Sequence, residues 1–165
     1  MESEASVVKD SEPRPTPINQ TDRTEVLCTI RQLFSDNQAR DRDTAIHDVA
    51  GALGYQRVGP RIREIFHTDL VTAMRRGILQ NQNGQLSLLA RDLRDYQRDF
   101  LKENFLSAIG RVWIERADAI QAFARWLGFS RTGSVIEETG YSLINGLLRD
   151  RRLEADKSQI RRATG

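Results

Sequence analysis

The sequence predicts a mainly α-helical protein with small β-hairpins, an α+β fold in which one unit is used twice. The first observation behind this prediction is a repeated turn, since residues 53–59 read LGYQRVG and residues 127–133 read LGFSRTG. The second is that the chain aligns with itself around this turn, without gaps, at an offset of 74 residues. The third is that apolar residues before and after each turn recur at helical spacing. We therefore expect two copies of a helix, a turn, a longer helix and a hairpin.

Identical residues extend the repeat well beyond the turn. At the 74-residue offset the sequence pairs Arg42 with Arg116, Ala45 with Ala119, Ile46 with Ile120, Ala50 with Ala124, Ile62 with Ile136, Glu64 with Glu138, Arg75 with Arg149 and Leu79 with Leu153. Where the copies differ, they mostly exchange similar apolar side chains, as at Val49 and Phe123. A spacing kept over this length predicts the same fold in both copies.

The helices of the first copy have local signals. Residues 45–53 carry an apolar stripe of helical period, and Gly54 can take the left-handed conformation that ends a helix. Pro60 suits the first turn of the next helix, which we place at residues 60–76. A tight turn between two such helices is typical of the helix-turn-helix arrangement, in which the second helix can enter a major groove.

A hairpin is expected after the second helix of each copy. Asn83-Gly84 is the strongest short-range hairpin signal, whereas the second copy has a poorer turn at residues 156–158. The strands are expected at residues 78–81, 85–89, 152–155 and 159–162.

Each copy is also preceded by a helix, which completes the unit. Thr24 is the expected N-cap of a helix that runs to residue 34, and a second helix is expected at residues 96–109, followed by a short strand at 111–114. Helix, short strand or loop, helix, turn, helix and hairpin describe a winged helix. We predict a tandem winged helix-turn-helix protein with a tail at residues 1–23, a first unit at 24–90, a linker at 91–95 and a second unit at 96–163.

Composition limits the classes of function. The net charge is +2, but the first 22 residues hold five acidic against two basic residues, a net −3, which leaves +5 for the remainder. This mild basicity is compatible with a polyanionic partner without establishing one. The tail contains Pro13, Pro15 and Pro17 and is expected to be disordered. The single cysteine, Cys28, cannot form an internal disulfide, and the absence of signal-peptide or membrane-spanning runs predicts a cytoplasmic protein.

The second unit resembles a known domain family. Residues 124–133 (ARWLGFSRTG) and 144–154 (INGLLRDRRLE) are similar to the winged-helix modules near the C-termini of large bacterial proteins of the helicase and restriction-endonuclease type. The resemblance covers roughly residues 42–162 and consists mostly of core and turn positions. It implies the winged-helix fold, DNA as the partner, and a larger protein with helicase or nuclease activity as a possible second partner. No Gly-Lys-Ser/Thr phosphate loop accompanies these modules here.

The candidate DNA-binding residues lie in the turns, on the outward side of each long helix and in the second hairpin. Basic, hydroxyl and amide side chains there can donate to phosphates or base edges. Glu137 and Glu138 argue against the second long helix, since carboxylates repel phosphates, and each outward residue is either a nucleic-acid contact or solvated surface. The candidates are Arg57, Arg61, Arg63, His67, Thr68, Arg75, Arg131, Tyr141, Ser142, Asn145, Arg149, Lys157, Arg161 and Arg162.

The turn arginines allow two interpretations. Arg57 and Arg131 lie where a winged helix often contacts the DNA backbone, so that each could bind a phosphate. Each also precedes a glutamate by seven residues, Glu64 or Glu138, and could instead form an ion pair that braces the turn. The sequence leaves both interpretations open.

The remaining tryptophan and histidine residues are more consistent with structural roles than with binding or catalysis. We expect Trp113 and Trp126 to pack in a core or between the units rather than to stack on bases. His47 and His67 lack further ligands at metal-binding spacing, and no nucleophile or carboxylate pair suggests catalysis, so we expect neither metal, cofactor nor enzymatic activity. Two functions remain: a DNA-binding module that is an accessory or regulatory part of a DNA-processing or defence system, or a protein-interaction scaffold in a larger DNA-associated complex.

Overall fold

The computed structural model describes residues 22–164 of the chain, and residues 1–21 of the expected tail lie outside this range. Its elements, in chain order, are α2 (Arg23–Phe34), α3 (Arg42–Ala52), α4 (Pro60–Arg75), β1 (Leu79–Gln82), β2 (Gln85–Leu88), the 3-10 helix η3 (Leu93–Asp95), α5 (Arg98–Ile109), β3 (Ile114–Glu115), α6 (Arg116–Trp126), α7 (Ser134–Arg149), β4 (Leu153–Asp156) and β5 (Gln159–Arg162). We call α2 to β2 the first half and η3 to β5 the second half. The mainly helical α+β prediction is confirmed.

The element bounds repeat along the chain. α3, α4, β1 and β2 each recur 74 residues later as α6, α7, β4 and β5, with the same length. The sheets also correspond: β1 pairs with β2 and β4 with β5, all antiparallel, and β3 adds to β5 on its other edge. In the first half a single bridge, Arg40 to Leu86, stands in the position of the Ile114–Ile160 pair. The sequence repeat therefore corresponds to a repeat of secondary structure.

The turns have the backbone that their residues predict. Gly54 and Gly128 end their helices with φ of 94° and 81°, in the left-handed region that favours glycine. At the first hairpin Asn83 and Gly84 both have positive φ, and the Asn81 side chain accepts a hydrogen bond from the Gly84 amide at 2.8 Å. These local signals place the strands within one or two residues of their expected bounds.

Two local expectations are wrong. Asp22, not Thr24, caps α2, because its carboxylate accepts a hydrogen bond from the Thr24 amide at 3.1 Å. Of the strand expected at residues 111–114, Ile114 alone belongs to β3. The expected linker is also structured in part, since Leu93 of η3 is buried in the second half.

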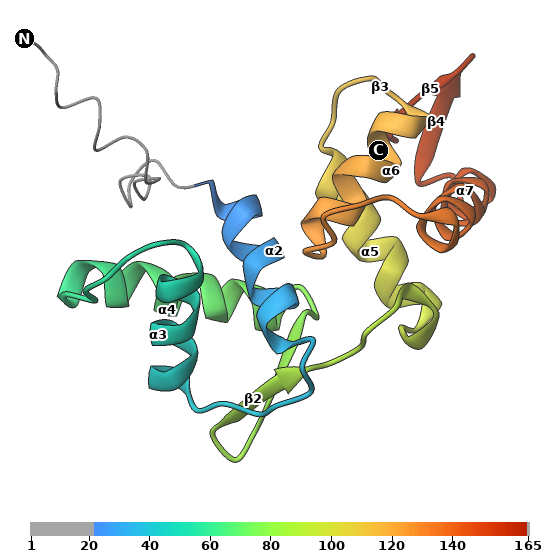
Figure 1. Ribbon diagram of the computed structural model, residues 1–165. Helices are drawn as coiled ribbons and strands as arrows, with labels where there is room; N and C mark the ends of the chain where they lie inside the picture. The colour runs from blue at the N-terminus through green and yellow to red at the C-terminus, as the bar shows by residue number, and fades with distance from the viewer. Residues whose placement is uncertain (1–21, 165) are drawn as a thin grey trace, which may run out of the picture.

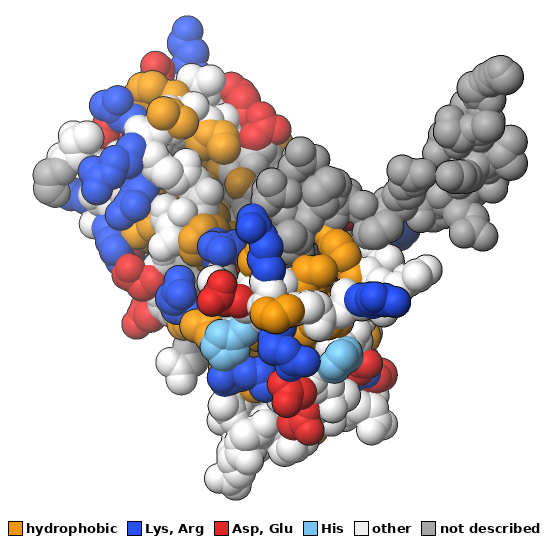
Figure 2. All heavy atoms as spheres, turned by 90° about the vertical axis from the view of Figure 1, so that its left-hand side faces the viewer, with side chains coloured by type: hydrophobic (Ala, Val, Ile, Leu, Met, Phe, Trp, Pro, Cys, Tyr) orange, Lys and Arg blue, Asp and Glu red, His pale blue; other side chains and the backbone are white. Residues whose placement is uncertain are grey.

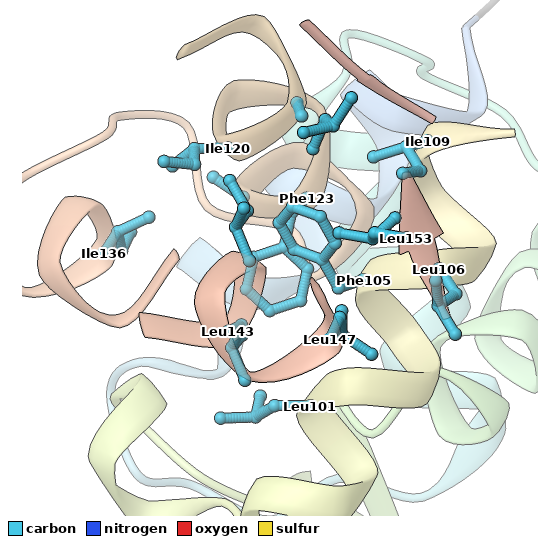
Figure 3. Packing of buried hydrophobic residues seen from close by; sticks show 14 of the residues in the cluster. Leu101, Phe105, Leu106, Ile109, Ile120, Phe123, Ile136, Leu143, Leu147 and Leu153 are labelled. Atoms are coloured by element: carbon cyan, nitrogen blue, oxygen red, sulfur yellow. The ribbon is translucent and has the colours of Figure 1, made fainter. Parts of the chain in front are cut away.

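The buried apolar residues form two clusters, one in each half. The first is built on α2, α3, α4, β1 and β2, with Phe34 and Phe66 among its largest side chains. In the second, Phe105 of α5 and Phe123 of α6 lie 5.2 Å apart between ring centroids, surrounded by leucine and isoleucine side chains (Figure 3). Each half thus has its own core, which fixes its helices against its hairpin.

A buried arginine joins the two halves. Arg31 of α2 is 6% exposed and donates hydrogen bonds to the carbonyl oxygens of Leu127 and Ala90 and to the Tyr96 hydroxyl, at 2.7, 2.9 and 2.9 Å. Its guanidinium carbon also lies 4.0 Å from the centre of the Phe129 ring. A buried charge with this set of acceptors is satisfied only in one relative position of the halves, which therefore form a single body.

A second contact supports the same arrangement. The guanidinium of Arg76, just after α4, lies 3.4 Å from the centre of the Trp126 ring, so Trp126 packs between the halves as expected. In this arrangement the two long helices, α4 and α7, lie on opposite sides of the molecule, with α2, α5 and α6 between them (Figure 1).

Candidate nucleic-acid interface

Exposed arginines gather on the turn before α4 and on α4 itself. Gly54 and Pro60 set the bounds of this turn, and Arg57 within it is exposed. On α4, the residues opposite the buried Phe66 and Leu70 face solvent because the helix buries only one stripe. Of the candidates on α4, the exposed ones are Arg61, Thr68 and Arg75, and the half-buried ones are Arg63 and His67.

Some of these side chains already have partners. Arg63 forms an ion pair with Asp43 of α3 at 2.8 Å, and the Thr68 hydroxyl donates to the Glu64 carbonyl oxygen at 3.1 Å. Among residues 22–164, Arg57, Arg61 and Arg75 form no ion pair. Their charges are therefore available to a partner outside the chain.

The bracing interpretation of the turn arginines is wrong. Within the described residues, Arg57 does not pair with Glu64, nor Arg131 with Glu138. All four side chains belong to exposed residues. The phosphate-binding interpretation stays a prediction.

The start of α4 is electrostatically suited to an anion. Its N-cap, Gly59, offers no side-chain acceptor to the first amides, and the first turn holds no acidic residue. Free amides at a helix start carry partial positive charge and can bind a phosphate oxygen. α7 also starts at an uncapped glycine, Gly133, but Glu137 lies in its first turn and opposes an anion.

The exposed side of α7 has a different chemistry. Glu137, Glu138, Asn145 and Arg149 are exposed, and Tyr141 has 45% of its surface in solvent. Together with half-buried Val135, these residues make a face that is polar and acidic rather than basic.

Ser142, another candidate on α7, is already engaged. Its hydroxyl and its carbonyl oxygen accept hydrogen bonds from the guanidinium of Arg98, at 3.1 and 2.9 Å. The residue therefore fastens α5 to α7.

The three candidate DNA-binding residues of the second hairpin differ in exposure and in their partners. Lys157 is exposed at the tip with a φ of 59°, and Arg162 is half-buried. Arg161 forms an ion pair with Glu154 at 3.0 Å and stacks 4.5 Å from the centre of the Trp113 ring. The structure thus does not bring all the candidates together, because α4 and the second hairpin lie on different halves (Figure 1).

The surface on the α3 and α4 side carries mixed charge. Lys and Arg side chains are spread over it, with Asp and Glu side chains between them (Figure 2). Binding to such a surface would depend on a few unpaired arginines rather than on a continuous basic field.

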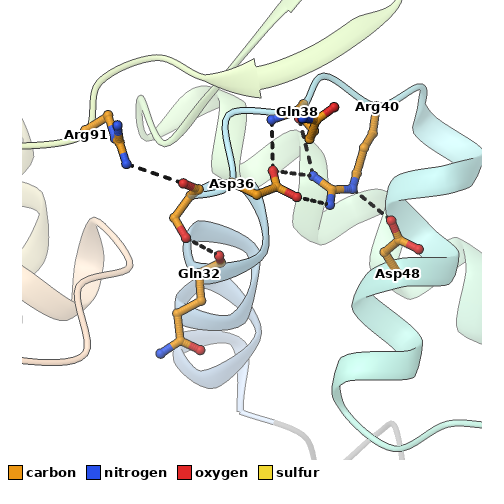
Figure 4. Close-up of polar contacts among 7 residues, drawn as sticks. Gln32, Asp36, Gln38, Arg40, Asp48 and Arg91 are labelled. Atoms are coloured by element: carbon orange, nitrogen blue, oxygen red, sulfur yellow. Dashed lines mark hydrogen bonds and ion pairs between the residues drawn. The ribbon is translucent and has the colours of Figure 1, made fainter.

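Arg40 shows that not every arginine near this surface is available. Its guanidinium bonds Asp36 at 2.7 Å, Asp48 at 2.8 Å and the Gln38 carbonyl oxygen at 3.3 Å, which fastens the loop between α2 and α3 (Figure 4). Hydrogen bonds from Arg40 hold the pKa of Asp36 below its usual range. Arg91 reaches the same loop from the chain after β2.

Cys28 and Asp69 have raised pKa values, which bears on whether they could act as a reactive thiol or a charged carboxylate. Burial raises the pKa of Cys28, so this thiol is less, not more, ionised than usual. Burial also raises the pKa of Asp69, which is 4% exposed inside the first half and pairs with Arg23 at 3.1 Å. In the part of the chain that the structure describes, no three His, Cys, Asp or Glu residues converge as a metal site would require.

Sequence patterns did not identify Arg31 and Arg76 as contacts between the halves, and they placed Trp113 wrongly. Arg31 directly follows Ile30 on the apolar side of α2, a signal that could have indicated a buried role, whereas nothing local marks Arg76. Trp113 is expected in a core or between the units, but it is 37% exposed, lies outside the core cluster and stacks with Arg161 of its own half, so this prediction is wrong.

Comparison of the chain with protein-family models, with curated proteins and with solved structures found no match. The site must therefore be interpreted from its own chemistry.

Within residues 22–164, none of the helices combines the length and apolar character that crossing a membrane requires.

Proposed function

We propose that this protein is a DNA-binding module made of two winged-helix units, which contacts duplex DNA through the turn before α4 and the exposed side of α4. The observation that carries the proposal is the set of exposed arginines without ion-pair partners in the described chain, Arg57, Arg61 and Arg75. Arg57 lies in the turn, and Arg61 and Arg75 lie on α4, whose first turn holds no acidic residue. This combination suits a phosphate backbone.

The cellular role follows from the resemblance of residues 42–162 to bacterial winged-helix modules. We place the protein as an accessory or regulatory part of a cytoplasmic DNA-processing or defence system in bacteria. In this role it binds DNA, has no catalytic activity of its own, and works beside a larger protein with helicase or nuclease activity.

The test compares equivalent positions of the two copies. Binding to a labelled random duplex of about 30 base pairs is measured by fluorescence anisotropy at about 50 and about 200 mM salt. We expect wild-type binding to weaken steeply with salt. Arg57→Glu with Arg75→Glu should lose about tenfold or more in affinity and reduce the salt slope by about 2.

The matched control is Arg131→Glu with Arg149→Glu, which makes the same changes 74 residues later. We expect it to keep most of the affinity, because the exposed side of α7 is acidic. Equal losses in both double variants would contradict the assignment to α4, and no wild-type binding at the lower salt would contradict the function itself.

A protein-interaction scaffold is the second candidate, and the surface of α7 favours it. A cavity of about 310 Å³ opens near the start of this helix, lined in part by Leu93, Phe129 and Ile136. Tyr141 is exposed on the same helix. A mainly apolar hollow beside a helix that also exposes a tyrosine and acidic side chains suits a protein partner better than it suits DNA.

A further inference from the structure

Trp113 occupies an unusual position for a large aromatic residue. It is 37% exposed, and its neighbour Val112 is 71% exposed. Neither side chain belongs to the core cluster of the second half. Leaving this much apolar surface in water forgoes the stabilisation of burial, so the position calls for an explanation outside the fold.

Strand register explains how the side chain comes to face outward. Ile114 pairs with Ile160, which is fully buried beneath the three-stranded sheet. Because side chains alternate along a strand, Trp113 and Arg161, one residue away from this pair, face the other side. The guanidinium carbon of Arg161 lies 4.5 Å from the centre of the Trp113 ring.

The stacked arginine is held in place from the next strand. Nε of Arg161 donates a hydrogen bond to Oε1 of Glu154 at 3.1 Å, and Nη2 forms an ion pair with the same oxygen at 3.0 Å. Nη1 of Arg161 has no hydrogen-bond partner within the described residues. An indole and a guanidinium plane are thereby oriented together on the outer face of the sheet, with one donor group left for a ligand.

The surroundings are basic overall. Residues 110–116 and 153–162 contain five basic and three acidic side chains, and Glu154 among the acids is paired with Arg161. Arg111 is exposed two residues before Trp113, and Lys157 is exposed at the hairpin tip, where its carbonyl oxygen accepts from Arg116 at 2.8 Å. Positive charges thus lie on both sides of the indole along β3 and the hairpin.

We propose that Trp113 and Arg161 form a stacking site for an unpaired nucleobase of single-stranded DNA, with Arg111 and Lys157 contacting the backbone on either side. The faces of bases inside a duplex are covered by their neighbours, whereas an unpaired base can stack on an indole without the cost of unstacking a duplex. The positive surroundings favour a polyanion over a protein segment. The proposal rests on the proposed function in taking DNA as the ligand.

This site is separate from the duplex interface. α4 and its arginines belong to the first half, whereas Trp113 and Arg161 belong to the second, and Arg31 holds the halves in one body. The substrate that fits both surfaces is DNA in which a duplex adjoins an unpaired segment.

The experiment uses the full chain and a fluorescein-labelled oligothymidylate of about 12 nucleotides, with a blunt duplex as the second probe. Base stacking on an aromatic side chain contributes about 1–3 kcal/mol, so Trp113→Ala should weaken oligothymidylate binding by about 5- to 150-fold. Trp113→Phe should keep most of the affinity, and both variants should bind the duplex as the wild type does. Far-UV circular dichroism checks that each variant is folded.

Intrinsic fluorescence gives an independent readout, since the chain has two tryptophans, Trp113 and Trp126. Unlabelled oligothymidylate should quench the wild type and leave Trp113→Phe, which keeps Trp126 alone, unchanged. Quenching that persists in Trp113→Phe would overturn the proposal. No oligothymidylate binding, or equal affinity for wild type and Trp113→Ala, would do the same.

The two proposals fail separately. Duplex binding that depends on Arg57 and Arg75, without oligothymidylate binding, would refute the stacking site and leave the proposed function in place. Oligothymidylate binding that depends on Trp113, without duplex binding, would refute the role of α4 and keep the stacking site.

Discussion

α4 and α7 occupy equivalent positions in the two copies and have the same length, yet they present different surfaces. Arg61 and Arg63 of α4 correspond to Val135 and Glu137 of α7, and His67 corresponds to Tyr141. The buried stripes are mostly apolar in both copies, whereas the exposed stripes are free to differ because they carry little of the stability. The same repeated helix therefore carries mainly basic side chains on its exposed side in the first half and acidic ones in the second half.

The buried Arg31 lies between the halves that carry α4 and α7, and replacing it should change stability more than any other substitution considered below. Arg31→Met keeps much of the side-chain volume but leaves the Leu127 and Ala90 carbonyl oxygens and the Tyr96 hydroxyl without their donor. We expect a loss of about 2–4 kcal/mol in the free energy of unfolding, measured by urea denaturation.

The control for Arg31 is Arg111→Met, which changes an exposed arginine of the second half. It should alter the free energy of unfolding by less than about 0.5 kcal/mol. An unchanged urea midpoint in Arg31→Met would show that the contact between the halves does not stabilise the fold.

The role of surface charge can be tested by giving α7 the arginines of α4. Val135→Arg with Glu137→Arg copies Arg61 and Arg63 onto the equivalent positions. If charge on this stripe decides which helix binds DNA, duplex affinity at about 50 mM salt should rise several-fold and its salt slope should steepen by about 1–2. The matched change to Val135→Gln with Glu137→Gln should have a smaller effect, and an equal effect of both would exclude phosphate contacts by the new arginines.

Among the buried residues of α4 and α7, Asp69 alone is ionisable, and changing it gives the smallest predicted effect. Asp69 of α4 stands where α7 has Leu143. Burial raises the pKa of Asp69 above the ordinary value of 3.8, against the opposing effect of Arg23. The folded state therefore binds this proton more tightly than the unfolded state, and the resulting stabilisation is complete below pH 3.8 and lost as the pH rises through the raised pKa.

Asp69→Asn removes this titration while keeping an oxygen for the guanidinium of Arg23. At neutral pH we expect a gain of about 0.5–1 kcal/mol in the free energy of unfolding, since the cost of burying the charge disappears. Urea denaturation across pH 4–7 should show a flatter pH profile for the variant. A variant less stable than the wild type at pH 7 would indicate that the ion pair outweighs the desolvation.

Local sequence patterns predicted most of the helices and strands and their repetition. Periodic apolar stripes, Gly54 and Gly128 at helix ends, Pro60 at a helix start and Asn83-Gly84 at a hairpin act within a few residues, so their consequences can be predicted locally. The same patterns placed most of the candidate residues of α4 and α7 on the outward sides of their helices.

Which of those residues are paired, buried or exposed depends on the tertiary structure. Arg31 finds its acceptors 59 to 96 residues away, and the ion pair of Arg63 with Asp43 joins two helices, so neither follows from a local pattern. The exposure of Trp113 depends on a two-residue strand register with β5. Packing between distant segments sets the charge, burial and direction of a side chain, because these depend on the neighbours that folding brings to it.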